Sequence, residues 1–334
     1  MLIAIRKLIY FSGKLLIMKI DILDETTIFK HLNTHKHAFL TDYYAFYSSW
    51  FGGITKDPRL MLVPLDDHMN HRGDGVFEAM KAAERSVYLM DEHLDRLLQS
   101  AEMIKIKTDL SKSEIKRIIL ETLQVADQNE AMIRIFLSRG PGSFSVNPYD
   151  TIGTQFYVAI TAFKPLPSIK YQEGVAIGKS TIPLKSSWLA TVKSCNYLPN
   201  VMMKKEAVDR NLEFVIGINQ EDFLAEGPTE NIVIIDSNDT IIHPEFDQIL
   251  KGTTLVRMSE LAKDAGMATA MRPISVKDLL FAKEVIMCGT TLDVLPVISF
   301  EGQPISDGKP GPIAAKLREM ILNDIKTGPR KTPF

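Results

Sequence analysis

Short apolar runs and amphipathic segments alternate along most of this chain. The apolar runs, which are bounded by turn residues and favour β-strands, lie at residues 61–64, 87–89, 132–138, 155–161, 175–177, 214–218, 231–235 and 285–288. The segments with apolar residues at helical spacing lie at residues 91–104, 111–125, 198–210, 255–265 and 313–326. Because both halves of the chain mix strands with helices, the pattern predicts an α/β or α+β protein of two domains.

Capping and turn residues refine this organisation. Ser111 and Glu114 fit a capping box, and Asp91 is a candidate N-cap. Residues 163–171 contain two prolines and no periodicity, which is typical of a linker. We therefore expect a partly helical N-terminal extension over residues 1–40, a small α/β domain over 41–163, a linker over 164–171 and a larger domain over 172–334.

The first 20 residues are apolar and basic, a composition that also occurs in signal peptides. Their apolar runs are short, Lys14 interrupts the second run, and no small-residue cleavage site follows. We expect a cytoplasmic protein without a cleaved leader. Met18 is an alternative start, which would make residues 1–17 upstream sequence.

Composition excludes several classes of partner. The chain of 334 residues has 39 Lys and Arg against 41 Asp and Glu, so no basic excess is present to neutralise nucleic-acid phosphates. It contains no apolar stretch of about 18 residues, so we expect no membrane span. Cys195 and Cys288 are its two cysteines and cannot form a disulfide framework, which favours a reducing compartment.

Several common catalytic and metal-binding motifs are absent from the sequence. It contains no HExxH or CxxC zinc signature and no GxSxG nucleophile turn. The segment GVAIGKS at residues 174–180 is one residue short of the glycine spacing of a phosphate-binding loop. We expect no metal site.

Other segments combine into a possible cofactor site. Lys193 lies among small residues and could form a Schiff base, and Glu226 could hold a protonated ring nitrogen. Two Gly-Thr-Thr turns, at residues 252–254 and 289–291, could bind a phosphate together with Arg96. Each part also has an ordinary explanation, because lone lysines and arginines are usually solvated and Gly-Thr-Thr often caps a helix.

A resemblance to a known family supports the cofactor interpretation. Eight segments follow one another between about residues 44 and 325: HRGDGVFEAMK, DEHLDRLLQSAEMI, RIFLSRGPG, TVKSCNYLPNVMMKKEA, EGPTENIVI, KGTTLVRMSELA, CGTTLDVLPV and GKPGPIAAKL. Together they resemble the class IV (fold-type IV) pyridoxal phosphate enzymes, which include branched-chain aminotransferases, D-amino acid aminotransferases and aminodeoxychorismate lyases. The segments YSSWFGGITKDP, LVPLDDHMNHRGDGVFE and ATVKSCNYLPN are most similar to the plant-type branch of D-amino acid aminotransferases and lyases.

The resemblance implies a small N-terminal and a larger C-terminal domain with pyridoxal 5'-phosphate between them, in a homodimer that completes each site. It implies that Lys193 is the catalytic Schiff-base lysine and that Glu226 pairs with the pyridine nitrogen. The other residues that it assigns to the cofactor are Arg96, Thr253, Thr254 and Thr290 at the phosphate and Tyr197 near the phenolic oxygen. Tyr197 is one residue closer to the lysine than the corresponding tyrosine of branched-chain enzymes.

The expected activity is exchange of an amino group between an amino acid, with D-amino acids as one option, and a 2-oxo acid. A 4-amino-4-deoxychorismate lyase that releases 4-aminobenzoate and pyruvate, a branched-chain aminotransferase and a non-catalytic scaffold are the alternatives. The candidate substrate-binding residues are Phe77, Arg134, Arg139 and Thr291. Arg134 matches an arginine of branched-chain enzymes that meets a side-chain carboxylate, and a structural ion pair is its other interpretation. The loop at residues 142–146 lacks the Arg and His with which bacillar D-amino acid aminotransferases bind the substrate carboxylate.

Overall fold

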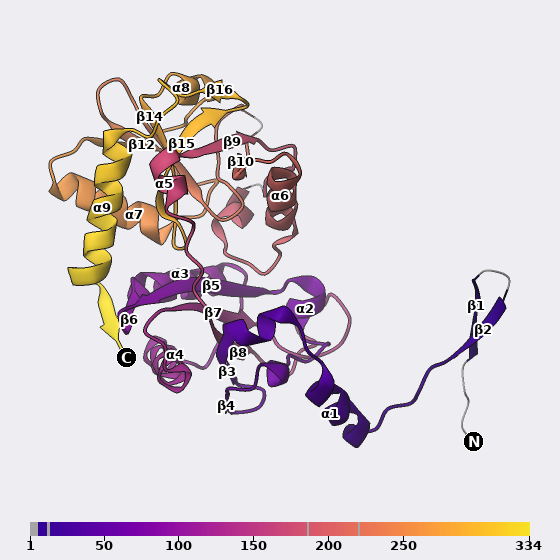
Figure 1. Ribbon diagram of the computed structural model, residues 1–334. Coiled ribbons are helices and arrows are strands. Elements are labelled where there is room, and N and C mark those ends of the chain that lie inside the picture. The colour runs from indigo at the N-terminus through magenta and orange to yellow at the C-terminus, as the bar shows by residue number, and fades with distance from the viewer. Residues whose placement is uncertain (1–5, 12–13, 186, 220) are drawn as a thin grey trace. The chain divides into compact units, whose positions relative to one another are not determined.

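The computed structural model describes residues 6–11, 14–185, 187–219 and 221–334 (Figure 1). The chain divides into two compact units, Met1–Thr41 and Asp42–Phe334. In the first unit, β1 (Arg6–Phe11) pairs antiparallel with β2 (Lys14–Lys19), and α1 (Glu25–Thr34) follows. Asp24 is the N-cap of α1, because its carboxylate accepts a hydrogen bond from the Thr27 amide at 2.8 Å. The short 3-10 helix η1 (Ala38–Asp42) leads into the second unit.

The second unit contains two sheets. The first has the strand order β17-β6-β5-β7-β8-β3-β4 and is antiparallel throughout. Its strands are β3 (Tyr43–Ser48), β4 (Gly53–Thr55), β5 (Gly75–Ala83), β6 (Ser86–Tyr88), β7 (Ala131–Ser138), β8 (Gln155–Thr161) and β17 (Lys331–Pro333). The 3-10 helix η2 (Pro58–Leu60) and α2 (His68–Arg72) lie between β4 and β5 in the sequence.

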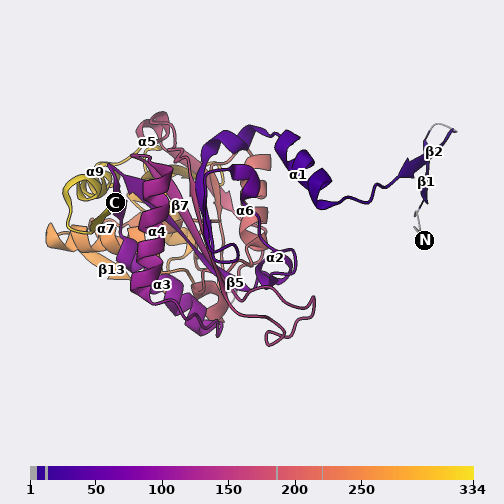
Figure 2. The ribbon, with the colours of Figure 1, turned by 90° about the horizontal axis from the view of Figure 1, so that it is seen from below.

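Two helices cover one face of the first sheet. The view from below shows α3 (Met90–Met103) and α4 (Lys112–Ala126) side by side along this face (Figure 2). α3 packs on β5, and α4 packs on β3 and β8. The apolar sides of both helices, with Leu94, Leu97, Ile115, Ile119 and Leu123 fully buried, form one core with the facing side chains of β5, β7 and β8.

The second sheet is mixed, with the order β10-β9-β15-β14-β11-β12-β13 and β16 paired to β15. Its strands are β9 (Val175–Lys179), β10 (Phe214–Ile216), β11 (Asn231–Ile235), β12 (Ile241–His243), β13 (Thr269–Met271), β14 (Glu284–Gly289), β15 (Asp293–Phe300) and β16 (Gln303–Pro304). α7 (Thr253–Asp264) and α9 (Pro312–Thr327) pack against each other and against β14.

The remaining helices of the second unit are α5 (Ile169–Glu173), η3 (Ser187–Thr191), α6 (Leu198–Asp209) and α8 (Val276–Leu280). None of the helices within the described ranges is long and apolar enough to cross a bilayer.

Buried polar contacts join the two sheets. Lys81 on β5 donates a hydrogen bond to Asp293 on β15 at 2.5 Å, and both side chains are largely withdrawn from solvent. The Tyr88 hydroxyl and the Arg257 guanidinium both donate to the Asp324 carboxylate, which links β6 with α7 and α9. The C-terminal strand β17 returns to pair with β6, so the first sheet takes a strand from each end of the second unit.

The observed elements confirm the predicted α/β (α+β) fold class. Every predicted helix is present with ends within two residues of the expectation, and the capping box of Ser111 and Glu114 is formed. The predicted strand at residues 61–64 is wrong, because Met61 and Val63 pack against Phe46 and Tyr157 without joining a sheet.

Asp91 is not an N-cap either. α3 begins after Leu89, which has a φ of 55°, and the Asp91 carboxylate accepts a hydrogen bond from Lys116 at 3.1 Å. The structure also contains several strands that the sequence pattern does not predict, including β5. Its apolar and polar residues do not alternate simply, because Glu78 and Lys81 on it are both buried.

Candidate active site

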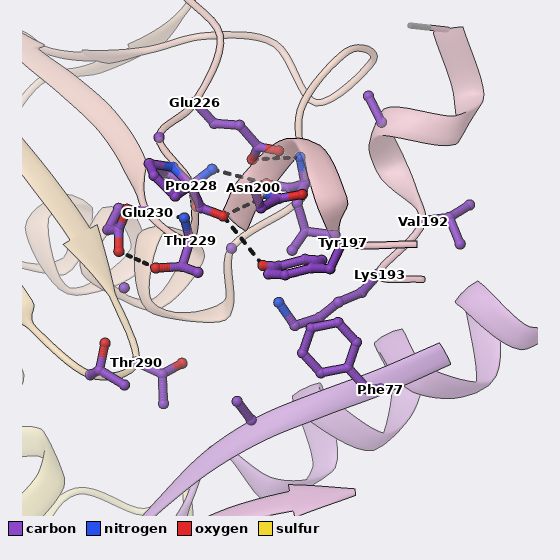
Figure 3. Close-up of a pocket in the computed structure, with 18 of the residues that line it drawn as sticks. Phe77, Val192, Lys193, Tyr197, Asn200, Glu226, Pro228, Thr229, Glu230 and Thr290 are labelled. Carbon is purple, nitrogen blue, oxygen red and sulfur yellow. Dashed lines mark hydrogen bonds between the residues drawn. The ribbon is translucent and has the colours of Figure 1, made fainter. Parts of the chain in front are cut away.

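A cavity of about 570 Å³ lies between the two sheets. β5, β7 and α3 contribute its wall on the side of the first sheet. The opposite wall comes from the segment before α6, the turn before β11, the start of α7 and the end of β14. Figure 3 shows Lys193 reaching into this space, with Glu226 on one side of its amine and Thr290 on the other. Of the four candidate substrate residues, Phe77, Arg134 and Thr291 line the cavity.

The backbone around Lys193 is held against β5. The Phe77 amide donates to the Lys193 carbonyl oxygen at 3.0 Å, and the Cys195 amide donates to the Gly75 carbonyl oxygen at 2.8 Å. From the other side, the Lys193 amide donates to the Ser100 hydroxyl oxygen at 3.3 Å. These bonds fix the backbone from which the Lys193 side chain extends into the cavity.

The amine of Lys193 lies in a mainly aromatic environment. Its Nζ is 4.7 Å from the centroid of the Phe77 ring and 5.8 Å from that of Tyr197. Burial, with a further contribution from the positive charge of Arg96, lowers the pKa of Lys193 to about 8. A substantial fraction of this amine is therefore neutral near pH 8, as a nucleophile or a general base requires.

Glu226 follows Ala225 at the wall of the cavity, where a bridge pairs it with Asn231 at the start of β11. One oxygen of the carboxylate accepts a hydrogen bond from the Leu250 amide at 3.0 Å. Burial raises the pKa of Glu226 to about 7, although the Leu250 amide and the Lys193 charge oppose this effect. A cationic group placed beside Glu226 would favour the ionised carboxylate.

Arg96 points into the cavity, and its interpretation as a solvated surface residue is wrong. Its side chain is 11% exposed. Its Nε and Nη2 donate to the two oxygens of the buried Glu78 carboxylate at 2.6 and 2.8 Å, and its Nη1 donates to the Lys251 carbonyl oxygen at 2.8 Å. Glu78 thus fixes the plane of the guanidinium, which brings Arg96 close to the start of α7.

The four threonines of the Gly-Thr-Thr turns line the cavity. Thr253 and Thr254 are the first two residues of α7, whose amino-terminal amides are unsatisfied within the helix and favour an anion. Gly252 precedes them, and a Cβ at this position would lie 1.9 Å from the Asn231 side-chain oxygen, so a larger residue there would have to displace Asn231. Thr290 and Thr291 follow β14 at the same cavity.

Tyr197 and Asn200 meet at a single carbonyl. The Tyr197 hydroxyl donates to the Pro228 carbonyl oxygen at 3.3 Å, and the Asn200 Nδ2 donates to the same oxygen at 2.6 Å (Figure 3). These contacts connect the start of α6 to the turn after Glu226. The Asn200 side-chain oxygen is buried at the cavity without a partner among the described residues.

Arg139 does not line the cavity. Its Nε and Nη2 donate to the Asp74 carboxylate at 2.6 and 2.9 Å, and the carbonyl oxygens of Ile104 and Lys105 accept its further hydrogen bonds. The structure therefore gives Arg139 a structural position in place of the predicted contact with substrate.

Arg134 on β7 contrasts with Arg139. It donates to the Thr161 hydroxyl oxygen at 3.1 Å, and no ion pair to it is formed within the described ranges. The sequence patterns do not single out five further residues that contact or line the site: Glu78, His93, Lys185, Asn200 and Glu230. An isolated residue of these types carries no distinctive signal, and the buried charge of Glu78 becomes recognisable only when its partners are known.

The side chains at the cavity could bind both an anion and a cationic group. The described residues contain no cluster of His, Cys, Asp and Glu that could hold a metal ion. The cavity instead combines one amine of lowered pKa, one buried carboxyl group and a group of phosphate-type donors, which are the parts that a phosphorylated aldehyde with a basic ring requires.

Comparison with known proteins assigns the family. The model for "Amino-transferase class IV" matches residues 75–300. The chain is 36% identical over 295 residues to the chloroplastic D-amino-acid transaminase of Arabidopsis thaliana, covering 85% of this chain and 77% of that protein. It is 33% identical over 281 residues to a putative branched-chain-amino-acid aminotransferase of Methanocaldococcus jannaschii, covering 83% and 96%.

Among solved structures, a T.th. branched-chain amino acid aminotransferase with pyridoxamine 5'-phosphate has the same fold. Its TM-score is 0.81 at 23% identity, and the match covers 87% of this chain and 98% of the other. The fold-type IV architecture expected from the sequence is therefore confirmed. On the family match and the two relatives above 30% identity, this chain belongs to the class IV aminotransferases, which use pyridoxal 5'-phosphate.

Proposed function

We propose that this protein transfers an amino group between a D-amino acid and a 2-oxo acid, with pyridoxal 5'-phosphate bound in the cavity between the two sheets. The observation that carries the proposal is the meeting of Lys193, Glu226 and Arg96 in one cavity, although they come from three distant parts of the chain. Burial of an amine, a carboxyl group and a guanidinium around one cavity costs free energy, which packing alone would not offset.

The donor set fits the cofactor. The amine of Lys193 suits attachment to the aldehyde, and Glu226 suits the ring nitrogen. The Arg96 guanidinium and the hydroxyls of Thr254 and Thr290 line the same cavity, and neither hydroxyl has a hydrogen-bond partner within the described part of the chain. The cavity of about 570 Å³ lies within the size range of cofactor pockets, roughly 300–1,000 Å³.

When bound, the cofactor supplies an electron sink for the negative charge that develops at the substrate α-carbon. Lys193 would remove a proton from the substrate α-carbon and return one to the cofactor carbon that carries the aldehyde, a task that suits an amine with a pKa near 8. Glu226 holds the ring nitrogen in its protonated form, and the Leu250 amide holds the carboxylate in place. Phe77 and Tyr197 exclude water from the Lys193 amine.

A cationic side chain is well suited to bind the carboxylate of the amino acid. Lys185 and Arg134 both line the cavity, and neither forms an ion pair with any residue that the structure describes. The Lys185 Nζ lies 5.3 Å from the centroid of the Tyr197 ring, and its burial lowers its pKa. We assign both residues to the carboxylate groups of the amino acid and the oxo acid.

The D-amino acid preference is supported by the Arabidopsis relative at 36% identity. The Methanocaldococcus relative and the position of Arg134 favour a branched-chain aminotransferase as the second candidate. The lyase would use the same lysine, and no contact in the structure favours it. A panel of D- and L-amino donors with pyruvate and 2-oxoglutarate, run beside an aminodeoxychorismate assay, separates the three. Turnover of L-leucine without D-alanine turnover would replace our proposal with the second candidate.

We further propose a homodimer. Large apolar side chains are exposed on the second unit, including Phe144, Tyr149, Trp188, Leu198 and Val201. Residues 188–201 also adjoin the cavity, so a partner subunit that covers them would close the site. Sedimentation velocity at micromolar concentration should give twice the mass of the chain.

The cytoplasmic location stays a prediction from the sequence, and the chloroplastic location is a property of the Arabidopsis relative.

A further inference from the structure

A chain of hydrogen bonds crosses between the two sheets beside Arg96. The Thr253 hydroxyl lies 3.2 Å from His93 Nε2, and His93 Nδ1 lies 2.7 Å from the Glu78 carboxylate, which also holds Arg96. Glu78 and His93 are almost completely buried. Glu78 lies on β5 of the first sheet, and His93 and Arg96 lie on α3, which packs on that sheet. Thr253 is the first residue of α7, which packs on the second sheet.

The direction of these hydrogen bonds follows from the charge of Glu78. Burial raises the pKa of Glu78, but Arg96 and His93 outweigh burial and hold that pKa well below its ordinary value. An ionised carboxylate can only accept, so His93 Nδ1 must carry the hydrogen. Burial lowers the pKa of His93 more than the Glu78 carboxylate raises it, which favours the neutral ring near pH 7 and makes its Nε2 an acceptor there. The Thr253 hydroxyl therefore donates to His93.

The hydrogen bond to His93 makes the Thr253 hydroxyl different from those of the other threonines at the cavity. Its hydroxyl has one hydrogen, and that hydrogen is directed to His93, away from the cavity. Phosphate oxygens are acceptors, so the Thr253 hydroxyl cannot donate to a phosphate while the His93 bond is intact. The hydroxyls of Thr254 and Thr290 have no such partner in the described ranges and stay available as donors.

We propose that His93 and Thr253 are positioning residues that hold α7 at a fixed distance from Arg96, and that the Thr253 hydroxyl does not itself bind the cofactor phosphate. This inference rests on the proposed function, because it takes the phosphate to lie between Arg96 and the start of α7. Among the described residues, two hydrogen bonds join α3 to the start of α7 and the residues just before it, one from Thr253 to His93 and one from Arg96 to the Lys251 carbonyl oxygen. If the bond between Thr253 and His93 is lost, only the bond from Arg96 to the Lys251 carbonyl oxygen holds this end of α7 beside Arg96.

Three variants distinguish positioning from simple packing. Thr253→Val removes the hydroxyl and keeps the shape of the side chain. His93→Asn keeps a donor near the Nδ1 position for Glu78 but removes the acceptor for Thr253. His93→Gln places an amide oxygen near the Nε2 position and should restore the bond to Thr253. The measurement is the dissociation constant of the cofactor-free protein for pyridoxal 5'-phosphate and for pyridoxal, which has the same aldehyde and ring without phosphate.

We expect Thr253→Val and His93→Asn each to weaken binding of pyridoxal 5'-phosphate about tenfold and to leave pyridoxal binding unchanged, whereas His93→Gln recovers most of the loss. The double variant of Thr253→Val and His93→Asn should lose no more than either single variant, because both remove the same bond. The inference is overturned by unchanged affinity for pyridoxal 5'-phosphate, by equal losses for both ligands, or by additive losses in the double variant. A parent protein that binds neither ligand would instead refute the proposed function itself.

Discussion

Lys193 and Phe77 are joined twice, once through the backbone and once through their side chains. The Phe77 amide donates to the Lys193 carbonyl oxygen at 3.0 Å, and the Phe77 ring centroid lies 4.7 Å from the Lys193 amine. The first contact sets the position of the lysine, and the second keeps water from its amine. Burial of this kind lowers the pKa of Lys193 to about 8.

Replacement of Lys193 by Ala should abolish attachment of the cofactor. Borohydride treatment should then fix no pyridoxyl group to the protein, and turnover should fall by about 10²–10⁴-fold or more because the general base is lost. Mass spectrometry of the reduced protein and a transamination assay provide the measurements. Lys205→Ala, on the exposed side of α6, is the matched control, and full transamination by the Lys193 variant would remove this lysine from the mechanism.

The attachment reaction should depend on pH through the Lys193 amine. A protonated amine is not a nucleophile, so the rate at which the cofactor-free protein captures pyridoxal 5'-phosphate should rise through about pH 8 and level off above it. Stopped-flow absorbance gives this profile. A midpoint near pH 10, the ordinary range of lysine, would show that burial does not control this amine.

Phe77→Ala should move that midpoint upward, toward the ordinary lysine value. The substitution admits water to the Lys193 amine, and burial is the larger of the effects that lower its pKa. The same stopped-flow profile is the measurement. Phe136→Ala is a matched control, because Phe136 lies against Phe77 at the cavity and has no aromatic contact with Lys193 among the described residues. An equal shift in both variants would contradict the assignment.

Glu226→Ala should reduce turnover much more than it reduces cofactor content. In the proposed function the carboxylate keeps the ring nitrogen protonated, whereas Lys193, Arg96 and the start of α7 would still hold the cofactor. The ratio of bound pyridoxal phosphate to protein, measured by absorbance after alkali release, is compared with the turnover number. Equal losses of cofactor and activity would show that Glu226 acts only in binding.

Arg134 and Arg139 should respond in opposite ways to replacement by Ala. Arg134→Ala should raise KM for 2-oxoglutarate with little change in thermal stability, because Arg134 faces the cavity without an acidic partner in the described ranges. Arg139→Ala should leave KM unchanged and reduce the free energy of unfolding by about 1.5–3 kcal/mol, as expected for loss of a hydrogen-bonded charged group. The reverse pattern would exchange their roles. Steady-state kinetics and denaturant unfolding measure the two effects.

The candidate site was recognisable from sequence where its residues lie in short, ordered motifs. Lys193, Glu226 and the Gly-Thr-Thr turns could be singled out because each occurs in an unusual local context. Arg139 shows the limit of such patterns. It follows a strand next to glycines, as a substrate-binding arginine could. In the structure its guanidinium pairs with the carboxylate of Asp74, which is 65 residues away in the sequence.

The sequence by itself determined the family, the mixture of strands and helices in both halves of the chain and the ends of the main helices. It could do so because helical periodicity, capping residues and motif order are local properties of the chain. Only the tertiary structure decided which charged groups neutralise each other, which hydroxyls stay free and which way each donor points. Glu78 and Thr253 lie 15 and 160 positions from His93 in the sequence but form one hydrogen-bonded chain with it, because burial and Coulomb interactions act through space.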